Sequence, residues 1–249
     1  MRSIALVVEY DGSGFHGFQR QSALPTIAAE LEEALAALCG HPVTVAGAGR
    51  TDAGVHATGQ VVSFETASDL QLERAPVALS ALLRKRHIAV LRAVERPRGF
   101  SARHDALART YRYRILNRIA PSPLLRGRVF FVRAALDPAR MRAAATALAG
   151  THDFTSFCAQ PPQRGRPTRT IERISVERSD DLIDIEVTAD SFLHQMVRII
   201  AGTLVEVGLG KRSAAEMPAL LARRDRKAAG VTAPAHGLYL THVRYDPPL

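Results

Sequence analysis

The sequence has no tryptophan and only two cysteines, Cys39 and Cys158, among its 249 residues. Two cysteines are too few for a disulfide framework or a four-cysteine zinc site. The nine histidines show no paired or clustered ligand spacing, so we expect no metal centre. A chain of this length buries about three quarters of its unfolded surface. We therefore expect a protein of a reducing compartment whose own core stabilises it.

Long hydrophobic runs are also absent. Arg198 and Glu206 interrupt the most apolar stretch, residues 192–209, so no segment predicts a transmembrane helix. The N-terminal residues reach Glu9 and Asp11 too soon for a secretory signal peptide. We expect a cytoplasmic protein that does not contact a membrane.

Lysine is scarce although positive charge is abundant. The chain has 33 Lys and Arg against 24 Asp and Glu, which gives a formal charge of +9, and only three of the cations are lysines. The planar guanidinium of arginine matches a phosphate group with a fork of donors. This bias favours a polyanionic partner such as RNA. Arginine enrichment through the coding composition of a genome is the alternative that charge alone leaves open.

Hydrophobic periodicity predicts two successive halves. The expected strands are 3–10, 43–46, 60–65 and 88–94 in the first half, and 108–116, 169–177, 182–189 and 238–245 in the second. The expected helices are 26–38 and 72–83, then 138–150, 192–207 and one that begins at the capping box of Ser213 and Glu216. Each half has a β-α-β-β-type order, which predicts an α+β fold with a mainly antiparallel sheet and helices on one face. We place the domains at residues 1–104 and 105–249.

The segment Gly12–Gly17 has the G-x-G-x-x-G spacing of a dinucleotide-binding loop and directly follows a predicted strand. That function also requires a helix N-terminus at the pyrophosphate. Helical periodicity begins only at Thr26, so we expect no such site. The exposed residues of this loop, Gln19 and Arg20, could contact a phosphate backbone, or the loop could be an ordinary connection between a strand and a helix.

The densest group of chemically active residues is Gly47–His56, with the sequence GAGRTDAGVH. Glycines on both sides of Asp52 permit tight turns and a close approach of the backbone to a planar substrate. A turn in which Asp52 only caps backbone groups is the structural alternative. The case for a metal bound by Asp52 and His56 is weaker still, because the other histidines show no suitable ligand spacing.

The run Arg50–His56 resembles the active-site signature of the TruA family of tRNA pseudouridine synthases. Further stretches resemble other parts of that family in the same order along nearly the whole chain: Tyr10–Gln19, Arg109–Tyr113, His152–Phe157, Phe192–Gly202 and Ala233–Leu238. One segment departs from the family pattern. Where the family usually has an Asn, then Leu-Pro and Asp-Ile, this chain has SALLRKRHI at residues 80–88.

The resemblance implies roles for three catalytic residues, in a cleft between the two halves. Asp52 is the essential carboxylate, acting as a nucleophile on the sugar or base or removing a sugar proton. Arg198 is the cation that keeps this carboxylate ionised in a closed pocket. Tyr111 lies against the uracil, where its ring can stack and its hydroxyl can lie near C5. Residues 108–116 alternate, with Tyr111, Tyr113 and Ile115 on one face. Alternation alone favours a core aromatic at Tyr111, and the resemblance favours the substrate contact instead.

The resemblance also implies the substrate. A uridine in a stem must be flipped out before its base can react, and Arg50 is the residue expected to reach into the RNA. Gln19, Arg20 and His56 complete the expected substrate contacts. The expected reaction is isomerisation of uridine to pseudouridine at tRNA positions 38, 39 and 40, in the anticodon stem-loop, by a homodimer without cofactor or metal. A noncatalytic RNA-binding or RNA-chaperone module and a nucleoside hydrolase that uses Asp52 are the alternatives.

Overall fold

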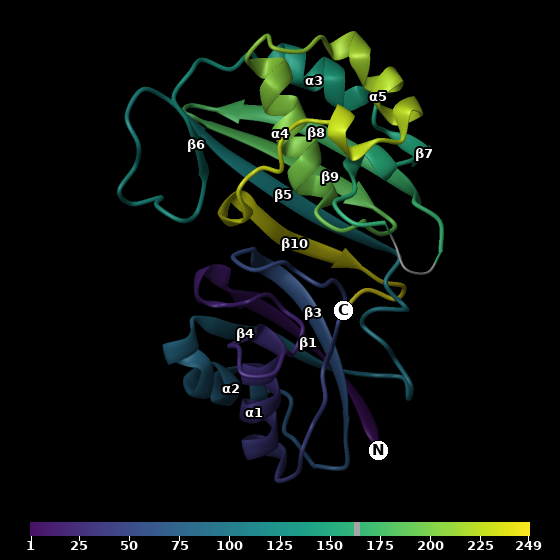
Figure 1. Cartoon of the computed structure of the whole chain (residues 1–249). Coiled ribbons are helices and arrows are strands. Elements are labelled where there is room, and N and C mark those ends of the chain that lie inside the picture. The colour runs from purple at the N-terminus through teal and green to yellow at the C-terminus, as the bar shows by residue number, and fades with distance from the viewer. Residues whose placement is uncertain (162–164) are drawn as a thin grey trace. The chain divides into compact units, whose positions relative to one another are not determined.

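The computed structural model describes residues 1–161 and 165–249, which form two compact units (Figure 1). The first unit is Met1–Arg109 with Tyr239–Leu249, and the second is Thr110–Leu238. The grouping differs from the halves expected from sequence chiefly at the C-terminus. The last strand joins the first unit because Tyr239 pairs in parallel with His56.

The sheet of the first unit has the order β4-β1-β3-β10, and a short strand, β2, pairs with β3. These strands are β1 (Arg2–Tyr10), β2 (Ala46–Gly47), β3 (His56–Thr66), β4 (Ile88–Arg96) and β10 (Leu238–Arg244). β1 lies between β3 and β4 and is antiparallel to both. The residues just after β1 and just before β3 therefore lie close together at the same end of these strands.

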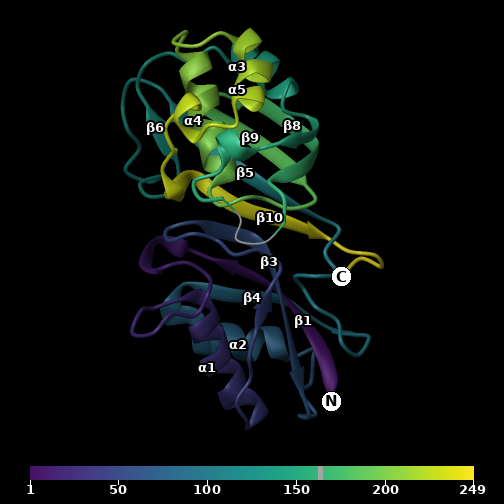
Figure 2. The same cartoon turned by 45° about the vertical axis from the view of Figure 1, so that its right-hand side comes forward.

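Two helices, α1 (Ile27–Cys39) and α2 (Ala75–Leu83), pack against each other on one face of this sheet (Figures 1 and 2). The Thr26 side chain caps α1 by accepting a hydrogen bond from the Ala29 amide. Gly40 ends it in the left-handed conformation, with φ of 76°. The predicted start of this helix is confirmed. The helix therefore begins too far after Gly17 to supply the N-terminus that a dinucleotide-binding loop requires.

The second unit has the strand order β5-β9-β8-β7, and β6 pairs in parallel with β5. Its strands are β5 (Ala108–Asn117), β6 (Phe130–Val132), β7 (Gly150–Asp153), β8 (Thr168–Ser179) and β9 (Leu182–Ala189). Its helices are α3 (Pro138–Thr146), α4 (Met196–Gly208) and α5 (Met217–Arg223). Over the described residues the chain has ten strands, mostly antiparallel, and five α-helices, which confirms the predicted α+β class.

Several elements differ from the sequence expectation at their ends. The helix expected at 192–207 begins at Met196, because Gln195 has φ of 59° and interrupts the helical conformation. The strand expected at 43–46 is reduced to β2. The helix expected to reach Gly150 ends at Thr146, and β7 begins after it. None of the helices in the described part of the chain is long and apolar enough to cross a membrane.

Candidate active site

Asp52 lies in the first unit, in the loop that connects β2 to β3. The chain turns directly after it, with the Val55 amide donating to the Asp52 carbonyl at 3.1 Å and Gly54 at φ of 77°. This left-handed conformation is accessible to glycine at little cost. The turn leaves Asp52 half-buried and Arg50 exposed, so both predicted site residues stand on a tightly folded loop.

A buried side-chain amide holds the loop ahead of Asp52. Gln60 on β3 is fully buried. Its Nε2 donates to the Gly49 carbonyl at 2.8 Å, and its Oε1 accepts from the Gly49 amide at 3.3 Å. The hydroxyls of Tyr10 and Thr51 lie 2.8 Å apart, and Gln60 Nε2 also donates to the Tyr10 hydroxyl at 3.3 Å. Gln60 thus holds the backbone before Arg50, and Tyr10 holds the side chain of the residue after it.

The Tyr10 hydroxyl is strongly affected by this environment. Burial raises the pKa of Tyr10 to about 12, although the hydrogen bonds with Thr51 and Gln60 oppose the rise. The phenol therefore stays neutral near pH 7 and keeps its proton for hydrogen bonding. A neutral, fully satisfied polar group can be buried beside the loop without the cost of an unpaired charge.

The first and last glycines of the 12–17 loop are explained by close packing against the Asp52 loop. A Cβ on Gly12 would lie 2.0 Å from the Val55 carbonyl oxygen, and one on Gly17 would lie 2.8 Å from the Thr51 carbonyl oxygen. The next residue, Phe18, donates its amide to that Thr51 oxygen at 3.0 Å. The G-x-G-x-x-G spacing therefore serves contact between two loops of the same unit.

His56 is buried inside the first unit, with 1% of its surface exposed. Its Nδ1 lies 3.1 Å from both the Gly12 amide nitrogen and Asp11 Oδ1. Its ring stacks on Tyr239 with centroids 4.8 Å apart. The predicted substrate contact of His56 stays a prediction, and the structure shows a side chain that joins the first loop to the start of β3.

Gln19 and Arg20 are exposed on the segment that follows the glycine loop. Arg20 forms an ion pair of 2.5 Å with Glu32 on α1, and 63% of its side chain remains exposed. Backbone hydrogen bonding between Phe18 and Thr51 places this segment beside the Asp52 loop. The expected phosphate contacts of Gln19 and Arg20 stay a prediction.

Arg109 is a supporting residue that the sequence argument did not single out. Its buried side chain donates from Nε to the Ala48 carbonyl at 3.1 Å and from Nη1 to the Ala106 carbonyl at 3.0 Å. Gln60, likewise, was expected only as the first residue of a strand. Gln60 directly precedes Val61 and Val62 at the start of that strand, and this position carries no sequence signal of its contact with Gly49.

Tyr111 and Arg198 both belong to the second unit. Tyr111 is buried on β5, and its ring meets Phe192 edge to face with centroids 5.0 Å apart. The expected alternation of β5 is confirmed, because Tyr111, Tyr113 and Ile115 are all buried. Burial thus fits both the stacking role and the core role that the sequence left open for Tyr111.

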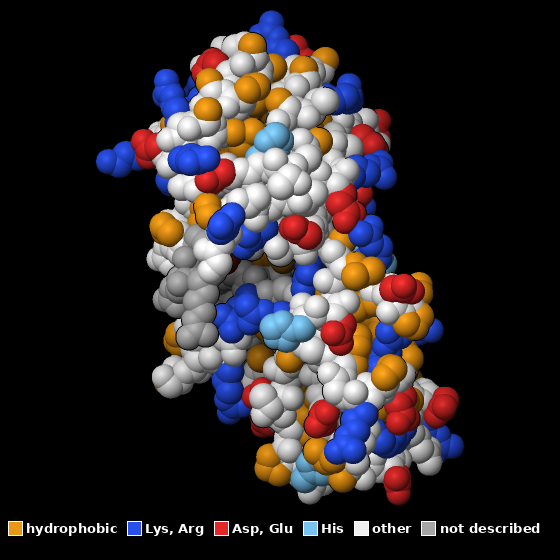
Figure 3. Space-filling model, turned by 90° about the vertical axis from the view of Figure 1, so that its right-hand side faces the viewer, with side chains coloured by type: hydrophobic (Ala, Val, Ile, Leu, Met, Phe, Trp, Pro, Cys, Tyr) orange, Lys and Arg blue, Asp and Glu red, His pale blue; other side chains and the backbone are white. Residues whose placement is uncertain are grey.

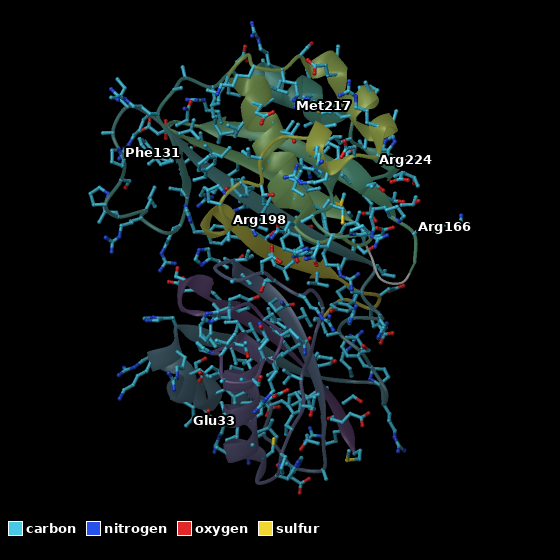
Figure 4. The ribbon with its side chains drawn as sticks, viewed as in Figure 1. Glu33, Phe131, Arg166, Arg198, Met217 and Arg224 are labelled. Carbon is cyan, nitrogen blue, oxygen red and sulfur yellow. The ribbon has the colours of Figure 1, made fainter. Side chains whose placement is uncertain are left out.

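Arg198 is half-buried on α4 (Figure 4). Its Nε donates to the Ala233 carbonyl at 2.9 Å, and the Ala233 amide donates back to the Arg198 carbonyl at 3.1 Å. Burial raises the pKa of Tyr113, and the positive charge of Arg198 opposes that rise. Its neighbours along the helix, Val197 and Ile199, are buried.

The predicted catalytic residues are thus divided between the units, with Asp52 on the first and Tyr111 and Arg198 on the second. The expected pairing of Asp52 with Arg198 stays a prediction.

The part of the chain that the structure describes holds no group of three or more His, Cys, Asp or Glu able to bind a metal. On the face drawn in Figure 3, Lys and Arg side chains are scattered among acidic ones.

Comparison with known proteins identifies the family of this chain. A family model described as tRNA pseudouridine synthase matches residues 6–105 and 144–246, which include both the Asp52 loop and Arg198. The class is therefore that of enzymes that modify uridine in RNA. The chain belongs to the tRNA pseudouridine synthase family, which isomerises uridine to pseudouridine in tRNA.

Curated relatives match nearly the whole chain. A tRNA pseudouridine synthase A of Acetivibrio thermocellus is 44% identical over 245 residues, which are 98% of this chain and 100% of the relative. One of a Methylobacterium strain is 48% identical, with 98% and 97% covered, and one of Caulobacter vibrioides is 45% identical, with 96% and 97% covered. A chain from a crystal structure of a Cbf5-Nop10-Gar1 complex aligns with 95% of this chain and 48% of its own length, at 12% identity and a TM-score of 0.36, too distant to add to the argument.

Proposed function

We propose that this enzyme converts uridines of the tRNA anticodon stem-loop, at positions 38, 39 and 40, to pseudouridine through Asp52. The observation that carries the proposal is the construction of the Asp52 loop. Buried or nearly buried groups hold it by hydrogen bonds: Gln60 and Arg109 donate to its backbone at Gly49 and Ala48, and the Tyr10 hydroxyl bonds to the Thr51 side chain. Such support pre-organises a reactive carboxylate and would be unnecessary for an ordinary surface turn.

The reaction breaks the bond between C1′ and N1 of uridine, rotates the base, and joins C1′ to C5. The proton that C5 loses on rejoining is balanced by the proton that N1 gains, so the product is an isomer. Neither electrons nor a transferred group enter or leave, and the proposed mechanism uses no cofactor. Asp52 acts as the nucleophile on the sugar or base, or as the base that removes a sugar proton.

The other residues have complementary roles in this proposal. Arg198 supplies the positive charge that keeps Asp52 ionised when the pocket excludes water. Tyr111 stacks on the uracil, and its hydroxyl takes or relays the C5 proton. Arg50 enters the space that the flipped nucleotide leaves. Gln19, Arg20 and His56 are the proposed additional contacts on the substrate side.

Tritium release from tRNA labelled at uridine C5 tests the proposal. The isomerase releases tritium and frees no uracil, whereas a nucleoside hydrolase frees uracil and an RNA chaperone does neither. Mapping pseudouridine in the product tRNA then tests the positions. Product confined to the anticodon stem-loop supports the proposal, and modification elsewhere contradicts the assigned substrate region.

We also propose that the enzyme works as a homodimer in the cytoplasm. A tRNA is longer than one 27.0 kDa protein, and two-fold pairing is the commonest way to extend a basic surface. Sedimentation at micromolar concentration should show a dimer. A fully active monomer under the same conditions contradicts this proposal and leaves the isomerase assignment intact.

A further inference from the structure

The turn between α2 and β4 carries three consecutive cations, Arg84, Lys85 and Arg86, and all three side chains are exposed. We call these three residues the basic turn. It lies within residues 80–88, where the sequence departs from the family pattern, and none of the roles described above uses it. Its charge and its position therefore require a separate explanation.

The backbone of the basic turn is anchored at both ends. Leu83 before it and Ile88 after it are each 2% exposed. The Ser80 hydroxyl bridges α2 to β4, accepting from the Val90 amide at 2.9 Å and donating to its carbonyl at 3.2 Å. The turn closes through a hydrogen bond from the His87 amide to the Arg84 carbonyl. Because the backbone is already ordered, binding of a ligand to these cations would lose little backbone conformational entropy.

The charge of the basic turn is mostly uncompensated. Arg86 forms an ion pair with Glu30 on α1 at 3.0 Å. Over residues 1–161 and 165–249, no carboxylate lies within ion-pair distance of Arg84 or Lys85. Two adjacent cations on a rigid turn suit the closely spaced phosphates of a nucleic acid backbone.

The basic turn is also close to the loops of the candidate active site within the first unit. Ile88, at its end, pairs with Tyr10 across β1 and β4. Asp11, which directly follows β1, donates its amide to the His87 carbonyl at 3.1 Å. Gly12 follows, and it packs against Val55 of the Asp52 loop. Cations on this turn are therefore presented beside the segment that supports the Asp52 loop.

We propose that Arg84 and Lys85 form a contact site for the phosphate backbone of the tRNA substrate, next to the nucleotide that reacts. The inference rests on the proposed function, since it takes tRNA as the ligand. Arg86 remains paired with Glu30 and mainly fixes the turn. The site contributes to binding of the RNA and has no part in bond breaking.

The test compares two double variants that remove the same charges. Arg84→Gln/Lys85→Gln neutralises the basic turn. Arg98→Gln/Lys211→Gln is the control: both residues are exposed, Arg98 follows the end of β4 that pairs with Ser3 rather than Tyr10, and Lys211 belongs to the second unit. Thermal unfolding of both variants checks that each is folded, and Arg84→Lys/Lys85→Arg should retain tRNA affinity.

The measured quantities are tRNA affinity against salt concentration and tritium release at saturating tRNA. Loss of two phosphate contacts should make the log–log salt slope shallower by roughly 1.5 and weaken binding at low salt about tenfold, with an unchanged maximal rate. The control should change the salt slope and the low-salt affinity much less, again with an unchanged maximal rate. Equal effects in the two double variants would overturn the site, because net charge alone would then explain them. A wild-type enzyme that binds tRNA but releases no tritium contradicts the proposed function instead.

Discussion

Gln60 and Gly49 form a two-bond ring, in which one side-chain amide satisfies both the carbonyl and the amide of a loop glycine three residues before Asp52. Because both bonds fall on the same residue, they restrict rotation of the Gly49 backbone. The Tyr10 hydroxyl extends the same network to Thr51. Residues of β1 and β3 thus fix the conformation of the Asp52 loop.

We expect Gln60→Leu to lower the free energy of unfolding by about 2–4 kcal/mol, because two backbone groups of Gly49 lose their buried partners. The maximal rate of tritium release should fall more than the KM for tRNA changes, since the loop carries Asp52. Ser63→Ala is the control on the same strand, where the hydroxyl accepts a hydrogen bond from Ala102. It should cost stability and leave the rate unchanged. Equal rates for both variants would show that Gln60 has no effect on the site.

Tyr10→Phe should change how stability depends on pH. The folded-state pKa of Tyr10 is raised to about 12 by burial, above about 10 in the unfolded chain. The contribution of the protonated Tyr10 to the free energy of unfolding is therefore fully present below pH 10 and is lost as pH rises through 12. Urea denaturation at pH 9 and pH 11 should show a fall for the wild type that is smaller in the variant. The same fall in both proteins would contradict a buried, protonated Tyr10.

The loop glycines offer a matched pair. Gly12→Ala places a methyl group 2.0 Å from the Val55 carbonyl oxygen, whereas a Cβ at Gly14 has nothing within 4 Å. Gly12→Ala should displace the Asp52 loop and reduce the rate at least tenfold, while Gly14→Ala should be close to wild type. Single-turnover rates and thermal unfolding measure the two effects. A fully active Gly12→Ala enzyme would mean that the loop tolerates displacement.

Asp52→Asn should abolish pseudouridine formation and change tRNA affinity by less than about tenfold, or about 1.4 kcal/mol. The amide has nearly the shape of the carboxylate but neither its charge nor its nucleophilicity, and phosphate contacts elsewhere maintain binding. Filter binding and tritium release measure the two properties. Wild-type turnover in this variant would remove Asp52 from the mechanism.

Two substitutions of Tyr111 should separate stacking from proton transfer. Tyr111→Leu should lose on the order of 1–3 kcal/mol of base binding, because the stacking surface is removed. Tyr111→Phe should retain binding but slow the chemical step, since general acid–base assistance is worth about 10²–10⁴ in rate. Single-turnover kinetics with saturating enzyme isolate that step. A near-wild-type rate for Tyr111→Phe would limit Tyr111 to stacking.

The local elements were predictable because their signals are local. Thr26 starts α1 by a side-chain hydrogen bond three residues ahead, and Gly40 ends it by its left-handed conformation. The alternation of β5 follows from the opposite directions of successive side chains. The Asp52 loop was recognised by the residues of its own motif. The start of α4 was not predicted, because the left-handed conformation of Gln195 has no signature in the apolar pattern around it.

By itself, then, the sequence determined the α+β class, most of the strands and helices and the family to which the chain belongs. Only the tertiary structure decided that Gln60 and Tyr10 hold the Asp52 loop, that Gly12 is required by Val55, and that the last strand belongs with the first unit. The physical reason is that these contacts join residues far apart in the chain. Their hydrogen bonds and close approaches exist only once β1, β3 and β10 are side by side, and no local pattern of residues encodes them.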